Sequence, residues 1–129
     1  MSERPSFLSA SAYKDEILAL PVSELDAASS WYCKHFGMTE IARLDAPCPT
    51  VILQRDGVQM GFAVNGGDPS QDGAAIRVRD IHGVKTQLES NGIDVGAMRV
   101  DERQGEKFNV FFVIAPDGLC YYFHEPVAG

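Results

Sequence analysis

Apolar and polar residues follow a helical period in two segments of the chain. In residues 24–36, the apolar side chains on one helical face are Leu25, Ala28, Tyr32 and Phe36. In residues 81–91 they are Ile81, Val84 and Leu88. A spacing of three to four residues places such side chains on one side of an α-helix. The pattern therefore predicts two amphipathic helices, each with one buried face.

The predicted helices are bounded by residues typical of helix ends. Ser23 and Asp80 precede the apolar stripes, and their side-chain oxygens can accept hydrogen bonds from N–H groups of the first turn. Gly37 and Gly92 follow the stripes, and Gly92 can adopt the left-handed conformation that ends many helices. We therefore expect Ser23 and Asp80 to be the N-caps.

The remaining apolar segments alternate as strands and form a repeat. Asp56-Gly57 separates two apolar segments within 52–62, and Asp117-Gly118 does so within 113–123. Both dipeptides tolerate the positive φ of a tight hairpin turn. The helix signal and the hairpin signal each recur after roughly 60 residues, the kind of period that marks a duplicated unit. We expect a polar loop at 101–107 to hold the extra residues of the second copy.

The repeat predicts an α+β fold built from two tandem βαβββ modules. We expect an N-terminal tail at 1–14, a first module at 15–64 and a second module at 73–126. The segment 65–72 is rich in glycine and polar residues and is expected to be the linker. The length of 129 residues suits one compact domain overall.

Composition narrows the classes of partner. The net charge of −7 disfavours nucleic acid and favours neutral or cationic ligands. No apolar stretch approaches the roughly 20 residues that cross a bilayer, and no signal peptide is recognisable, so we expect a cytoplasmic protein without membrane contact. Cys33, Cys48 and Cys120 lack a C-x-x-C spacing and are expected to be reduced thiols.

Two motifs resemble the glyoxalase/bleomycin-resistance/dioxygenase (vicinal oxygen chelate) superfamily. Residues 21–38, with the pair Trp31-Tyr32 and the helix end Phe36-Gly37, are similar to that family's opening strand and helix. The segment Ala115-Pro116-Asp117-Gly118 is similar to the family's turn before the last strand. The resemblance covers about residues 16–125. It implies a curved mixed sheet around one cavity, and a homodimer, as in many relatives.

The resemblance also implies where a metal would bind in the family's enzymes. The corresponding positions here hold Ile17, Gly61, Gly73 and Tyr122, none of which provides the expected imidazole or carboxylate. Strand alternation places Ile17 and Ala19 toward the cavity and Leu18 toward the helix. We therefore expect no metal cofactor.

One alternative keeps a metal. A displaced site would require two or more of Asp15, Glu16, His124 and Glu125 to converge on one point.

Strand alternation gives the candidate ligand-binding residues. Those expected to face the cavity with polar or aromatic groups are Phe112, Tyr122, Arg77, Gln59, Cys120 and His124. An apolar and aromatic wall with a few polar groups suits a ligand held by burial and stacking. Other roles are compatible with the same residues: Phe112 and Tyr122 could fill the space between the modules, Arg77 could keep a strand edge soluble, and His124 could be a solvated strand-end residue. No catalytic residue is assigned.

Three functions are compatible with the sequence. The first is metal-independent binding and sequestration of a small molecule, an antibiotic or another aromatic or cationic compound. The second is a metal-dependent lyase similar to lactoylglutathione lyase, an isomerase or a dioxygenase. The third is a non-catalytic interaction module in which Phe112 and Tyr122 close the cavity.

Overall fold

A computed structural model describes residues 5–12, 17–46, 48–67, 72–116 and 118–127. In chain order, the helices and strands are β1 Ser6–Ala12, β2 Leu20–Pro21, α1 Leu25–His35, β3 Thr39–Leu44, β4 Thr50–Arg55, β5 Val58–Ala63, β6 Asp72–Arg79, α2 Ile81–Ser90, β7 Arg99–Arg103, β8 Glu106–Ile114 and β9 Cys120–Pro126. The order of strand, helix and three strands occurs twice, from β2 to β5 and from β6 to β9.

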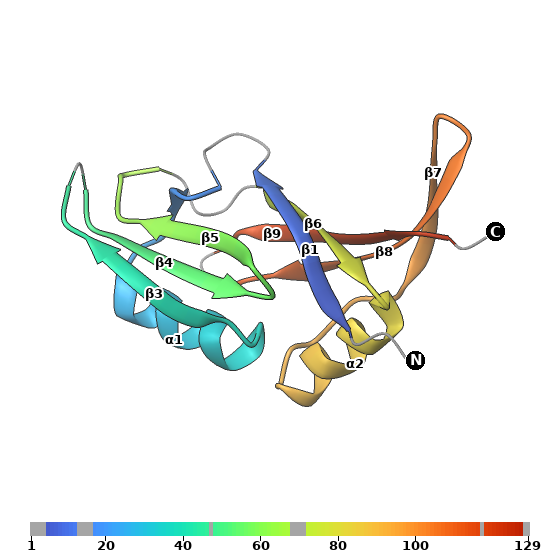
Figure 1. The fold of residues 1–129 in the computed structure, drawn as a ribbon, viewed down its shortest axis with the longest axis horizontal. Coiled ribbons are helices and arrows are strands. Elements are labelled where there is room, and N and C mark those ends of the chain that lie inside the picture. Colours follow the sequence, from blue (N-terminus) through green and yellow to red (C-terminus); the bar gives the residue numbers. More distant parts are fainter. Residues whose placement is uncertain (1–4, 13–16, 47, 68–71, 117, 128–129) are drawn as a thin grey trace.

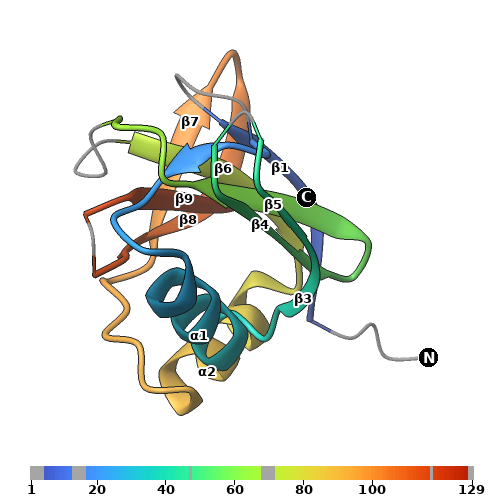
Figure 2. The same ribbon diagram turned by 90° about the vertical axis from the view of Figure 1, so that its left-hand side faces the viewer.

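The strands form two mixed sheets. One sheet has the order β2-β5-β4-β3 and the other has the order β1-β6-β9-β8-β7. The pairs β2–β5 and β6–β9 are parallel, and the other neighbours are antiparallel. Both helices lie on the same side of the sheets, and the β7–β8 hairpin curls toward the opposite side (Figures 1 and 2). The predicted α+β class with two βαβββ modules is confirmed.

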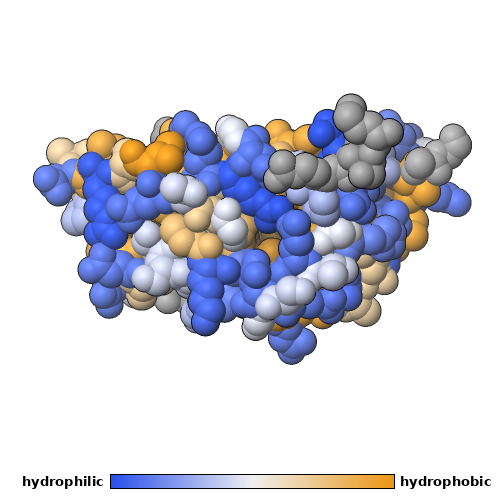
Figure 3. Space-filling model, turned by 60° about the horizontal axis from the view of Figure 1, so that its bottom comes forward, coloured by the Kyte–Doolittle hydropathy of each residue, from blue (hydrophilic) through white to orange (hydrophobic). Residues whose placement is uncertain are grey.

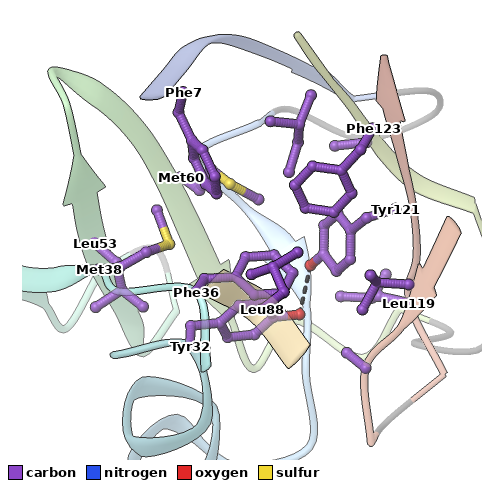
Figure 4. Close-up of a cluster of buried hydrophobic side chains, with 14 of the residues drawn as sticks. Phe7, Tyr32, Phe36, Met38, Leu53, Met60, Leu88, Leu119, Tyr121 and Phe123 are labelled. Carbon is purple, nitrogen blue, oxygen red and sulfur yellow. Dashed lines mark hydrogen bonds between the residues drawn. The ribbon is translucent and has the colours of Figure 1, made fainter. Parts of the chain in front are cut away.

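An aromatic core joins the two modules. Phe36, which directly follows α1, is fully buried and has its ring centroid 5.4 Å from that of Tyr121 and 5.6 Å from that of Phe123, both on β9. The hydroxyl groups of Tyr32 and Tyr121 are hydrogen-bonded across the same boundary (Figure 4). Phe7 of β1 packs against Phe36 and Phe123 at 6.2 and 5.9 Å. The modules therefore share one interior.

Several predicted turn and cap residues have the expected geometry. Asp56 and Gly57 have φ of 53° and 82° and connect β4 to β5. The Asp80 carboxylate accepts a hydrogen bond of 3.2 Å from the backbone N–H of Gly83, which makes Asp80 the N-cap of α2. Gly92 has φ of 97° after α2, as predicted for a left-handed helix end. Asp117 lies outside the described residues.

The N-cap prediction for α1 is wrong. The helix begins at Leu25, and Glu24 is its N-cap with an extended backbone and no side-chain cap hydrogen bond. Ser23 lies one position too early, because the apolar stripe alone does not define the first helical residue to better than one or two positions.

Two segments expected to be irregular form strands. Residues 6–12, assigned to the N-terminal tail, form β1, which pairs with β6 and lies next to β5 (Figure 1). Its Phe7 is buried, and β1 covers backbone groups of β6 that an exposed sheet edge would leave unpaired. The polar segment 101–107 forms a hairpin, in which Gln104 and Gly105 have φ of 50° and 82° between β7 and β8.

The side-chain alternation predicted before Leu20 is also wrong. Leu18 is 41% exposed, whereas Ile17 packs against the core. Strand β2 contains only two residues, and the Ile17 carbonyl instead accepts a hydrogen bond of 2.8 Å from the backbone N–H of Gly61. The backbone therefore leaves the regular strand path at 17–18, and alternation cannot be extended there.

Candidate functional site

Strands β8 and β9 present different residues on their two faces. Tyr121 and Phe123 of β9, with Phe111 of β8, are buried in the core on the helix side. Tyr122 and His124 alternate with them and so point to the opposite side of the sheet. We call that side of the sheet β1-β6-β9-β8-β7 the open face.

Four rings form an aromatic row on the open face, namely Phe108, Phe112, Tyr122 and His124. Phe112 is paired in register with Tyr122, and their ring centroids are 5.2 Å apart. The Tyr122 and His124 rings are stacked at 5.4 Å, and the Phe108 and His124 rings meet edge-on at 6.1 Å. Phe112 is 37% exposed, so one end of the row is accessible to a ligand.

Strand β7 places charged groups against the aromatic row. The guanidinium of Arg99 lies 5.0 Å from the Phe112 ring centroid, and that of Arg103 lies 4.8 Å from the Tyr122 ring centroid. Between them, Asp101 accepts a hydrogen bond of 3.0 Å from the Tyr122 hydroxyl and forms an ion pair of 3.1 Å with the Arg99 Nε. These contacts tie the Tyr122 hydroxyl to β7 and orient Arg99 over Phe112.

The surroundings favour the uncharged forms of both titratable rings. Burial raises the pKa of the Tyr122 hydroxyl, and its hydrogen bond to Asp101 acts in the same direction, while Arg103 opposes them. Burial lowers the pKa of His124 below 6.5, and the positive charges of Arg103 and Arg77 lower it further. At neutral pH the Tyr122 and His124 rings are therefore uncharged, but Tyr122 is buried at 5% exposure, so Phe112 is the ring available for stacking with a ligand.

Three other sequence-predicted residues take different places. Arg77 lies on β6 in register with His124 and is exposed, so it belongs to the same face. Cys120 is half-buried on β9, two residues before Tyr122 and therefore on the same side. Gln59 lies on β5 of the other sheet, and its side chain donates to the Gln54 side chain at 3.3 Å. The structure thus does not bring Gln59 into the aromatic row.

Sequence reasoning missed Arg99, Asp101, Arg103 and Phe108. The first three lie at alternate positions of β7. This strand overlaps the segment 101–107, whose polar composition led to the prediction of a loop. The local signal is Gly105, because glycine tolerates the positive φ of a hairpin turn and the alternating strand 106–114 follows it.

The positions that would hold a metal in the family's enzymes do not fit one. A Cβ placed on Gly61 would lie 2.1 Å from the Leu18 carbonyl oxygen, so no carboxylate side chain can be accommodated at this position. A Cβ on Gly73 would meet the Tyr121 ring at 3.3 Å. Within the part of the chain that the structure describes, no group of three His, Cys, Asp or Glu side chains could hold a metal ion.

The displaced metal site is no better supported by the described residues. Glu125 accepts hydrogen bonds from the backbone N–H groups of Asp80 and Ile81, at 2.7 and 3.0 Å, and so stabilises the N-terminus of α2. It lies on the helix side, whereas His124 faces the opposite side. Asp15 and Glu16 lie outside the described residues.

A separate cleft of about 730 Å³ opens on the helix side, between the end of α1, the β4–β5 turn and α2. Hydrophilic side chains predominate on this side of the molecule (Figure 3). At its floor, Arg55 is hydrogen-bonded to Asp56, to the Phe36 and Pro5 carbonyls and to the Gln87 side chain. None of the six ligand-binding residues predicted from the sequence lines this cleft. We interpret it as the boundary between the two modules, across which Arg55 donates a hydrogen bond to the Gln87 side chain.

Within the described residues, no helix has the length and apolar character needed to cross a membrane.

Comparison with solved structures identifies this arrangement of strands. A glyoxalase/bleomycin resistance protein/dioxygenase from Alicyclobacillus acidocaldarius has a TM-score of 0.70 and 19% identity, over 86% of this chain and 89% of that one. A bleomycin-binding protein complexed with bleomycin has a TM-score of 0.67 and 18% identity, over 88% and 98%. A genomically encoded fosfomycin resistance protein from Listeria monocytogenes has a TM-score of 0.60 and 16% identity, over 89% and 94%. These similarities establish the fold.

The sequence itself identifies the family. No curated protein matches the chain. The family model described as Glyoxalase/Bleomycin resistance protein/Dioxygenase superfamily matches residues 16–119, which is most of the chain and includes both motifs quoted from the sequence. The chain belongs to the glyoxalase/bleomycin resistance protein/dioxygenase superfamily.

Proposed function

We propose that this protein binds and sequesters a small aromatic compound on its open face, without a metal ion. The observation that carries the proposal is the aromatic row, which ends at the accessible ring of Phe112. An exposed aromatic side chain that its neighbours hold in one orientation, as Tyr122 and Arg99 hold Phe112, binds a planar ligand at a small cost in conformational entropy. An antibiotic is one candidate ligand, because a solved relative of this fold is a bleomycin-binding protein.

The close packing of the backbone of residues 17–18 against Gly61 supports binding without a metal ion. The backbone of residues 17–18 occupies the space into which a ligating side chain on β5 would extend. A metal-dependent lyase, isomerase or dioxygenase would need another set of ligands, and Glu125 already binds backbone N–H groups of α2. Binding without chemistry is therefore the better supported function. A homodimer remains our prediction from the family resemblance.

Ligand binding is tested with Phe112→Ala and a matched control. Bleomycin and a panel of planar aromatic compounds are titrated into the protein by calorimetry. Loss of the stacking partner in Phe112→Ala should weaken binding of a positive compound about tenfold. Leu44→Ala removes an exposed apolar side chain from β3, which belongs to the other sheet, and should leave the affinity within about twofold. Equal effects of both substitutions would show that the aromatic row is not the binding site.

Metal independence is tested by elemental analysis of the purified protein, followed by thermal unfolding with added Ni²⁺, Zn²⁺, Mn²⁺ or Fe²⁺. We expect no stoichiometric metal and no change in the unfolding temperature. A metal present at one per chain that also raises the unfolding temperature by several degrees would refute this part of the proposal.

A further inference from the structure

The open face carries a local charge opposite in sign to that of the whole protein. By strand alternation four arginines lie on it, Arg77, Arg79, Arg99 and Arg103, and the carboxylates on the same side are those of Asp101 and Glu106. The chain as a whole has a net charge of −7. At physiological salt, charges more than roughly 8 Å apart are largely screened, so a ligand on this face responds mainly to the nearby groups.

The carboxylate nearest the aromatic row is already neutralised. One oxygen of Asp101 accepts the Tyr122 hydroxyl hydrogen bond, and the other is paired with the Arg99 Nε. A cationic ligand would therefore have to compete with Arg99 for Asp101. An anionic ligand would share Arg99 with Asp101, since the ion pair is made through Nε and the Arg99 side chain is 59% exposed.

The arginines are placed beside the ring that would stack on a ligand. The Arg99 guanidinium lies against Phe112, and Phe112 is the exposed end of the aromatic row. A guanidinium is planar and presents paired N–H donors that match the two oxygens of a carboxylate. A ligand ring in contact with the part of Phe112 that Arg99 leaves exposed would thus have its substituents within reach of the guanidinium.

We infer that the ligand of the open face is an anionic aromatic compound, a planar ring bearing a carboxylate that Arg99 binds while the ring stacks on Phe112. This inference rests on the proposed function and specifies its ligand class. It replaces the expectation, drawn from the overall acidity of the chain, that the ligand is cationic.

The pKa of His124 responds to the arginine charges on this face. The charges of Arg103 and Arg77 add to burial in lowering its pKa. A bound carboxylate would offset part of that positive field, and the pKa of His124 should then rise on binding. This shift gives a readout separate from affinity.

The test uses three probes with one ring system, namely 2-naphthoate, 2-naphthalenemethanol and 2-naphthylmethylammonium. Their affinities are measured by calorimetry at about 0.1 M salt. We expect 2-naphthoate to bind about tenfold more tightly than the neutral probe, and the ammonium probe to bind most weakly. Arg99→Gln should remove the preference for 2-naphthoate, whereas Phe112→Ala should weaken all three probes.

Lys107→Gln is the matched control for charge. It removes one positive charge from β8 at a position that alternates away from the open face, between Glu106 and Phe108. The preference for 2-naphthoate should persist in this variant, and Arg99→Lys should retain part of it because the charge remains. In the wild-type protein, 2-naphthoate should raise the pKa of His124 followed by NMR.

The outcomes separate the inference from the proposed function. Equal affinities for the three probes, still reduced by Phe112→Ala, would overturn the charge preference and leave binding at the aromatic row intact. Tighter binding of the ammonium probe would also overturn the inference. No binding of any probe, or binding that Phe112→Ala does not affect, would contradict both.

Discussion

The close approach of two backbones at Gly61 predicts that Gly61→Ala destabilises the protein strongly. The added methyl carbon would lie 2.1 Å from the Leu18 carbonyl oxygen, 2.4 Å from its carbonyl carbon and 2.7 Å from its Cα. All three neighbours are backbone atoms, so no side-chain rotation can relieve the contact. The segment 17–18 must move away from β5, and the hydrogen bond from the Gly61 N–H to the Ile17 carbonyl is then lost.

The expected magnitude follows from these two effects. Overpacking of a buried site costs about 1–3 kcal/mol. The lost backbone hydrogen bond adds about 1 kcal/mol, because its donor lies in a buried strand. We therefore expect the free energy of unfolding to fall by about 2–4 kcal/mol, to be measured by urea denaturation followed by circular dichroism.

Gly96→Ala is the matched control. Its new methyl group would have the Phe112 carbonyl oxygen as nearest neighbour at 3.9 Å, an ordinary van der Waals contact. Neither Gly61 nor Gly96 has a φ in the positive range that disfavours alanine. Gly96→Ala should change stability by less than about 1 kcal/mol in either direction. If the two variants were equally stable, the steric account of Gly61 would be refuted.

Three further predictions concern Arg55 in the cleft, the aromatic core and the aromatic row. Arg55→Met should lower the free energy of unfolding by about 2–4 kcal/mol, because it leaves buried acceptors unpaired, and Lys107→Met should have little effect in the same urea titration. Tyr32→Phe and Tyr121→Phe should each cost about 1–2 kcal/mol, and the double variant less than their sum, because each removes the same hydrogen bond; additive losses would exclude that coupling. Since the pKa of His124 is lowered in the folded protein, the unfolded chain takes up the proton first, so stability should fall as the pH drops below 6.5. His124→Gln should flatten this part of the stability curve, and an unchanged curve would contradict the assignment.

Local sequence signals predicted the elements whose geometry depends on a few adjacent residues. The Asp56-Gly57 turn and the Asp80 cap formed as expected, because positive φ and an N-terminal carboxylate are local requirements. Strand alternation also placed Phe112 and Tyr122 on one face correctly, since both lie within long regular strands. What they bind stays a prediction.

The features that sequence reasoning missed depend on contacts between distant segments. Residues 6–12 form strand β1 because they pair with the backbone of β6, and nothing within residues 6–12 alone indicates that partner. Gln59 was grouped with the aromatic row because one continuous sheet was assumed, whereas β5 belongs to a separate sheet. Arg99 was missed because a charged strand at a sheet edge has the composition of a loop.

The aromatic core shared across the two modules has a consequence for how the duplicated halves can be used. A fragment ending near residue 67 would expose Phe36 and Tyr32 to water, since their contacts with Tyr121 and Phe123 come from the other half. Each half therefore carries an apolar surface that only its counterpart covers. Cutting the chain within 65–72 and expressing the halves together should yield two fragments that assemble into one folded unit, while either fragment expressed alone should aggregate.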